Sequence, residues 1–90
     1  MKMLYAVRAL FMPSGEELRS KTLLVVHGRV EAIADFTAEM HSMIFVDEVY
    51  VSASPSLSSM EDMIKNEAPD IGGPLYAYSA DAAGNLSLLG

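Results

Sequence analysis

The segment from Leu23 to Phe36, LLVVHGRVEAIADF, decides between two kinds of fold. It can form a β-hairpin that turns at His27 and Gly28, or a strand that ends there and leads into an amphipathic helix. On a helical wheel, residues 30–44 place their apolar side chains on one side and most of their acidic ones on the other. Arranged as a strand, the same residues mix both kinds on one face. The helical period therefore predicts a helix over 30–44, with Gly28 as its boundary.

The residue pattern of several other segments predicts strands. β-Branched and aromatic residues in alternation are typical of strands, and Pro13-Ser14-Gly15 is a turn signal between the first two. The expected strands are Met3–Met12, Arg19–Val26, Ile44–Ser52, Leu75–Ala80 and Leu86–Leu89. Residues 81–85 are expected to form the last turn.

A second helix is expected between the third and fourth strands. Its apolar stripe consists of Leu57, Met60, Ile64 and Ala68. Pro69 ends it, because proline cannot continue a helix. Two starts are open: Ser54-Pro55, a cap followed by proline, and a capping box between Ser58 and Glu61.

The element order is therefore ββαβαββ, in a single α+β domain over residues 1–90. We expect a two-layer sandwich, in which a mostly antiparallel sheet carries two helices on one face. The alternative is a ferredoxin-like dimeric α+β barrel, which would require residues 16–42 to be largely helical. Val25-Val26 and Gly28 argue against it. Whether residues 16–28 form a strand or a helix stays open.

Charge and composition narrow the classes of function. The net charge is −6, and five of the six Lys and Arg residues lie within residues 1–29. An acidic chain is a poor nucleic-acid binder, whereas it suits a basic protein partner. The chain has no cysteine, so it forms neither disulfides nor thiolate metal sites. Its uncharged apolar runs are too short for a signal peptide or a membrane span, so we expect a cytoplasmic protein with no membrane partner.

Two histidines are the candidate chemical groups. His27 beside Gly28 can be a general base or the end of a strand, and His41 lies at the edge of the first helix's apolar arc. Together with Tyr50 they form an alternative pocket. Their spacing with Asp47 and Glu48 matches no metal motif. We predict no catalytic residue, no cofactor and no metal.

Two further groups of residues are candidates for binding. The cations Arg8, Arg19, Lys21 and Arg29 can form a patch for an anion or an acidic partner. The chain has seven methionines. Four of them can form an adaptable interface, namely Met40, Met43, Met60 and Met63.

One short segment resembles a known family. TLLVVHGRVEAIAD, residues 22–35, is similar to the strand-turn-strand near the start of metal-dependent amidohydrolases. The His-x-His metal motif of that family is missing, and 90 residues leave no room for its barrel. Nothing of the family's activity is transferred to this chain.

Together these patterns predict a non-enzymatic protein-interaction module that acts as a homodimer. Its role would be that of an adaptor, an inhibitor or an assembly subunit, and its size and charge also suit a phage or mobile-element inhibitor. Hydrophobic residues make up 51% of this small chain, which favours a second copy to cover exposed apolar surface. The alternative is a small-molecule-binding or enzymatic dimeric α+β barrel that uses His27 or His41.

Overall fold

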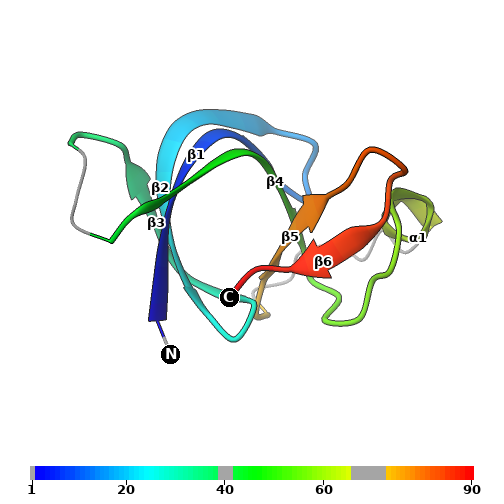
Figure 1. Ribbon diagram of the computed structural model, residues 1–90. Helices are drawn as coiled ribbons and strands as arrows, with labels where there is room; N and C mark the ends of the chain where they lie inside the picture. The colour runs from blue at the N-terminus through cyan, green and yellow to red at the C-terminus, as the bar shows by residue number, and fades with distance from the viewer. Residues whose placement is uncertain (1, 39–41, 66–72) are drawn as a thin grey trace.

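Six strands and one short helix account for most of the residues that the structure describes, which are 2–38, 42–65 and 73–90 (Figure 1). The structure is a computed structural model. The strands are β1 (Lys2–Phe11), β2 (Glu17–Val26), β3 (Arg29–Asp35), β4 (Ile44–Ser52), β5 (Tyr76–Ala80) and β6 (Leu86–Leu88). The helix is α1 (Met60–Lys65). No helix in these ranges is long and apolar enough to cross a membrane.

The strands form one mixed sheet that closes on itself. Its order is β3-β2-β1-β4-β5-β6, and a pairing of Arg29 with Tyr76 joins β3 to β5. Two backbone hydrogen bonds support this closure, from Val30 N–H to Leu75 O (2.8 Å) and from Ala77 N–H to Gly28 O (2.9 Å). β1 and β4 are parallel, and the other named pairs are antiparallel. In Figure 1, β1, β2 and β4 arch over one side, and β5, β6 and α1 lie at the other.

The predicted α+β sandwich is wrong, because the chain after Gly28 returns as strand β3 instead of entering a helix. His27 (φ 50°) and Gly28 (φ 80°) form the two-residue turn of a hairpin, and Val26 pairs with Arg29 across it. Positive φ at both central residues is the type I′ geometry, whose twist matches that of the flanking strands. The strand-turn-strand alternative for this segment is therefore the correct one.

A bulge in β3 explains the helical period of this segment. The register with β2 shifts after Leu24, so Glu31 is an extra residue in β3. An extra residue breaks the alternation of side chains along a strand. Val30 and Ile33, three residues apart as on a helix, therefore both pack against the core.

The ferredoxin-like alternative is also wrong, because β2 and β3 occupy most of the segment 16–42 that it required to be helical. α1 is the only helix in the described ranges, and it begins at Met60 rather than after Pro55. Ser59 Oγ accepts a hydrogen bond from Asp62 N–H (3.1 Å). In return, the Asp62 carboxylate accepts one from Ser58 N–H (3.2 Å). These bonds cap α1 one residue later than the predicted box between Ser58 and Glu61, and the carboxylate reaches the residue before the N-cap. Ala68 and Pro69 lie outside the described residues.

The remaining strand predictions are confirmed to within two residues. The turns at Pro13-Ser14-Gly15 and at residues 81–85 also lie where the sequence predicted them. Met12 O accepts a hydrogen bond from Gly15 N–H (3.0 Å), and Asp81 O accepts one from Gly84 N–H (3.0 Å). Strands bounded by strong turn signals were thus predictable from local sequence alone.

The main core lies inside the closed sheet. Its buried members are Tyr5, Val7, Leu10, Leu23, Val25, Val49, Val51, Ala77 and Leu89. On β1, the inward side chains step from Val7 to Leu10, three residues instead of two, and β4 makes the same step. The break lies at Arg8, which is placed between Ser20 of β2 and Asp47 of β4 by the neighbouring pairs. β1, β2 and β4 therefore interrupt the alternation of inward and outward side chains at the same height in the sheet.

A smaller core under α1 consists of Leu57, Tyr78 and Leu86. The Tyr78 hydroxyl donates a hydrogen bond to Ser54 O (2.6 Å) and accepts one from Leu57 N–H (3.2 Å). The hydroxyl thus satisfies two backbone groups of the segment between β4 and α1.

Replacing Tyr78 by phenylalanine is expected to lower the free energy of unfolding by about 1–3 kcal/mol, because it leaves the Leu57 N–H without its partner. Urea unfolding followed by circular dichroism measures this loss. Tyr76→Phe is the matched control, since its hydroxyl makes no hydrogen bond within the described ranges, and it should change stability by less than about 0.5 kcal/mol. Equal losses in the two variants would contradict the assignment.

The turn between β5 and β6 makes stability depend on pH. The Asp81 carboxylate accepts hydrogen bonds from Asn85 N–H and Ala83 N–H (both 2.9 Å), and the bonds from Asn85 are the main cause of its lowered pKa. A carboxyl whose pKa is lower in the folded state stabilises the fold above its unfolded pKa of about 3.9. This stabilisation is lost as the pH falls through the folded value.

We therefore expect wild type to be more stable than Asp81→Asn at pH 6 and the difference to shrink below about pH 4. Urea midpoints between pH 6 and pH 2.5 measure it. A difference that stays constant to pH 2.5 would count against this role of the carboxylate.

Candidate functional site

Both faces of the sheet formed by β1, β2 and β3 are apolar. Tyr5 and Leu23 stand opposite each other and face the core. The neighbouring positions point outward, and they too are apolar or uncharged. The residues on this side, which we call the outer apolar face, are Leu4, Ala6, Thr22, Leu24, Ala32, Ala34, Phe36 and Phe45. A sheet with one face in water normally carries polar side chains there.

Parts of the outer apolar face are open to solvent. Phe45 keeps 60% of its surface exposed. Ala32 and Ala34 are exposed as well, whereas Leu4 and Leu24 are half-buried. Contiguous exposed apolar surface of this kind marks interaction sites in small proteins.

A hollow of about 390 Å³ lies at the edge of this face. The rings of Phe36 and Phe45 meet edge-on above it, with centroids 6.4 Å apart and an interplanar angle of 62°. The lining residues are Ala6, Val7, Arg8, Ser20, Phe36, Phe45, Val46 and Asp47. The hollow thus combines apolar walls with one ion pair at its rim.

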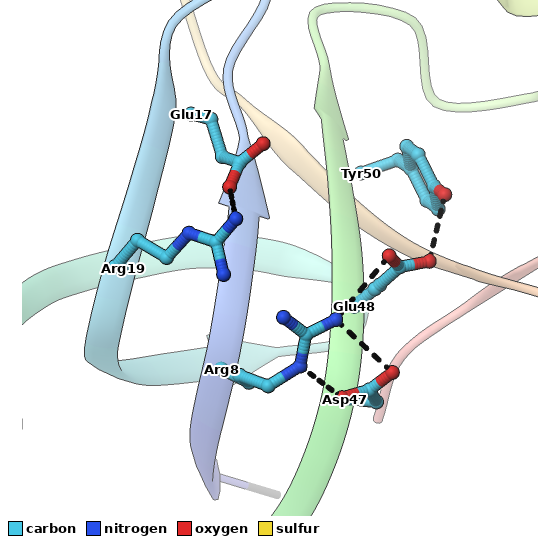
Figure 2. A network of polar contacts seen from close by, with 6 residues as sticks. All are labelled: Arg8, Glu17, Arg19, Asp47, Glu48 and Tyr50. Carbon is cyan, nitrogen blue, oxygen red and sulfur yellow. Dashed lines mark hydrogen bonds and ion pairs between the residues drawn. The ribbon is translucent and has the colours of Figure 1, made fainter.

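The ion pair at the rim belongs to a network of charged side chains across β2, β1 and β4 (Figure 2). The Arg8 guanidinium donates to both Asp47 oxygens, with Arg8 Nη2 3.3 Å from Asp47 Oδ2, and it lies 3.5 Å from Glu48 Oε2. The hydrogen bond from Arg8 is the main reason that the pKa of Asp47 is lowered. Arg19 pairs with Glu17 beside it. Asp47 therefore stays ionised, and the rim as a whole is close to neutral.

Ser20 adds local strain to the floor of the hollow. Its φ is 55°, in the left-handed region that residues other than glycine seldom adopt. Ser20 O accepts a hydrogen bond from Phe36 N–H (2.9 Å), and this bond holds the Phe36 backbone beside β2. Strained residues cluster at binding sites, which is consistent with a functional role for the hollow.

The four predicted patch cations each have a carboxylate partner. Besides the two arginines of the network, Lys21 pairs with Asp35, and Arg29 pairs with Glu31 (2.8 Å). An anion bound at any of them would have to displace that carboxylate. The anion patch stays a prediction.

The predicted methionine interface is divided in the structure. Met43 is half-buried just before β4, next to the exposed Ile44, whereas Met40 lies outside the described residues. Met60 and Met63 lie on α1 and line a second hollow of about 220 Å³ together with Ile64, which is 71% exposed. Met43 therefore lies on a different surface from Met60 and Met63.

The alternative pocket is not assembled by the residues that the structure describes. His27 is exposed at the tip of the β2–β3 hairpin, and His41 lies outside these residues. Tyr50 stacks on Phe11 with centroids 5.0 Å apart and donates to Glu48 Oε1 (3.2 Å). Burial, more than this bond, raises the pKa of Tyr50. Neither hollow described above is lined by His27 or Tyr50. The described ranges contain no group of three or more His, Asp or Glu side chains suited to hold a metal ion.

Phe36 and Phe45 are the site residues that sequence reasoning missed. The helical pattern of residues 30–44 places Phe36 on the buried side of a helix, and the strand pattern from Ile44 to Ser52 gives Phe45 no special role. The signal that could have found them is the nearly continuous apolar run of β1, which indicates a strand with apolar side chains on both faces. Comparison with protein-family models and with curated proteins finds no match to this chain.

Proposed function

We propose that this chain is a protein-interaction module that binds its partner through the outer apolar face. The observation that carries the proposal is the aromatic pair on that face: Phe45, 60% exposed, meets the half-buried Phe36 beside a hollow that both residues line. Aromatic side chains at the centre of an interface contribute a large share of the binding energy. The six other uncharged residues of this face surround the pair, and together they form a surface that a partner would remove from water.

The distribution of charge supports the same surface. The outer apolar face carries no charged residue, and the ion pair at its rim is internally compensated. The net charge of −6 therefore lies elsewhere on the chain. It would speed the approach of a basic partner, and it would oppose the approach of an acidic protein at every other surface.

Phe45→Lys tests the proposal, with Ile64→Lys on α1 as the matched control. Phe45 and Ile64 are both exposed apolar residues, but only Phe45 lies on the outer apolar face. Immobilised wild type and both variants are compared for the proteins they retain from lysate of the cells that make this protein. We expect Phe45→Lys to retain the partner at least about tenfold less than wild type, and Ile64→Lys to retain it unchanged. Equal retention by all three, or no retention by wild type, would refute the proposal.

A further inference from the structure

One edge of β4 is only partly paired with a neighbouring strand. On one side it pairs with β1 from Ile44 to Tyr50, and on the other side it pairs with β5 only from Tyr50 to Ser52. Among the described residues, the outward edge from Ile44 to Val49 has no ladder partner. An unpaired edge presents backbone N–H and C=O groups that can hydrogen-bond to a further strand.

The residues at this edge are apolar where the edge begins and acidic further along. Ile44 and Phe45 are 39% and 60% exposed, and Val46 is half-buried. Asp47 and Glu48 follow and are engaged with Arg8. Edge strands that are kept apart from other chains usually carry charge along their length, and the first three residues here carry none.

We propose that the partner at the outer apolar face is a second copy of this chain, whose β4 pairs antiparallel with β4 around a two-fold axis at Phe45. The inference rests on the proposed function, since it names the occupant of the same surface. The two four-stranded segments β3-β2-β1-β4 then continue into one another as a single sheet. Such an interface is isologous, the commonest kind in homodimers.

The charge pattern of β4 selects this register. With the axis at Phe45, the two Phe45 rings face each other, and Ile44 of each copy stands opposite Val46 of the other. The two Asp47 carboxylates are then four residue positions apart, about 14 Å along the strands, which exceeds the screening length of about 8 Å at physiological ionic strength. With the axis at Asp47, the two carboxylates would be directly opposite, which destabilises a pair of strands.

The net charge of the chain restricts where two copies can meet. Two copies with a charge of −6 each repel one another, so they approach most easily where each presents an uncharged surface. The outer apolar face is such a surface, and β4 forms one side of it. Arg8 stays on Asp47 of its own copy and limits the remaining repulsion.

Single-cysteine variants of the full chain test this geometry, because the protein has no cysteine of its own. Residues directly opposite in an antiparallel pair have Cα atoms about 4.5–5.5 Å apart, within the range that a disulfide spans. Ile44 of one copy stands opposite Val46 of the other, so we expect a mixture of Ile44→Cys and Val46→Cys, both of which keep Phe45, to form a disulfide-linked dimer at least about tenfold faster than Ile64→Cys at the same protein concentration. Equal rates of cross-linking would overturn the inference.

Sedimentation equilibrium of wild type, Phe45→Lys and Ile64→Lys gives the second measurement. Wild type and Ile64→Lys should be dimeric at micromolar concentration, whereas the dissociation constant of Phe45→Lys should rise at least about tenfold. A wild type that is monomeric throughout, or a dimer that Phe45→Lys leaves intact, would refute self-pairing at β4. If Phe45→Lys nonetheless lost a different protein partner, self-pairing would fail while the proposed function would stand.

Discussion

Replacing Gly28 by alanine is expected to lower the free energy of unfolding by about 2–4 kcal/mol, from backbone strain and overpacking together. The φ of Gly28 is 80°, which costs an L-residue about 1–2 kcal/mol. An added Cβ would lie 2.9 Å from Leu88 Cδ2 and 3.2 Å from Leu88 Cβ and Cγ. Because two of these atoms lie close to the β6 backbone, relief requires β6 to shift, which overpacking data place at about 1–3 kcal/mol.

Two further variants separate the two contributions. Gly15 has a φ of 90° with no atom within 4 Å of its added Cβ, so Gly15→Ala should lose only the strain, about 1–2 kcal/mol. The double variant Gly28→Ala/Leu88→Ala should lose less free energy of unfolding than its two single variants lose together, because removing the Leu88 side chain relieves the clash. Urea unfolding of wild type, the three single variants and the double variant measures this. Equal losses at Gly28 and Gly15 would show that the contact with Leu88 does not matter.

The hairpin at Gly28 also shows why the sequence misled the assignment of fold class. A type I′ turn favours Asn-Gly or Asp-Gly at its centre, and here His27 occupies the first position. The usual short-range signal for a hairpin was therefore missing. The prediction that Gly28 separates a strand from a helix is wrong, because Gly28 is the tip of the β2–β3 hairpin, and glycine alone does not say whether a helix or a strand follows.

The bulge at Glu31 removed the second signal. A regular strand would have alternated, and the extra residue instead placed Val30 and Ile33 on one face with helical spacing. Bulges are set by pairing with the neighbouring strand, which is a non-local property. The strands that pair regularly with turn signals at both ends, such as β4 and β5, were predicted from local pattern because nothing of this kind intervened.

The candidate site could be predicted only in part. Met43 is a predicted interface residue, and the structure places it directly before β4, next to the free edge of that strand; its role stays a prediction. The Phe36–Phe45 pair was not predicted, because the two residues come together only through the register of four strands and the Ser20–Phe36 hydrogen bond. Opposite charges in β1 and β4 were likewise visible in the sequence, but their parallel pairing was not.

Leu10→Ala is expected to lower the free energy of unfolding by about 3–5 kcal/mol, the upper range for removing a fully buried leucine. Leu10 is 0% exposed and stands opposite Leu18 of β2 and Val49 of β4. It is the first inward residue of β1 after the break at Arg8. The inward residues before the break and those after it follow two different alternations along the strand. A shift of one strand alone would not fill a cavity at this point, because β1, β2 and β4 change their inward face together.

The lower stability of Leu10→Ala should also appear as a lower urea concentration at the midpoint of unfolding. Small domains are stable by only about 5–15 kcal/mol, so the variant should unfold at a much lower urea concentration than wild type. Leu88→Ala removes the same atoms from a residue that is 45% exposed, and it should cost about 1 kcal/mol or less. The slope of the transition should be the same for both variants, because the surface exposed on unfolding hardly differs. Comparable losses at Leu10 and Leu88 would contradict the position of Leu10 at the centre of the core.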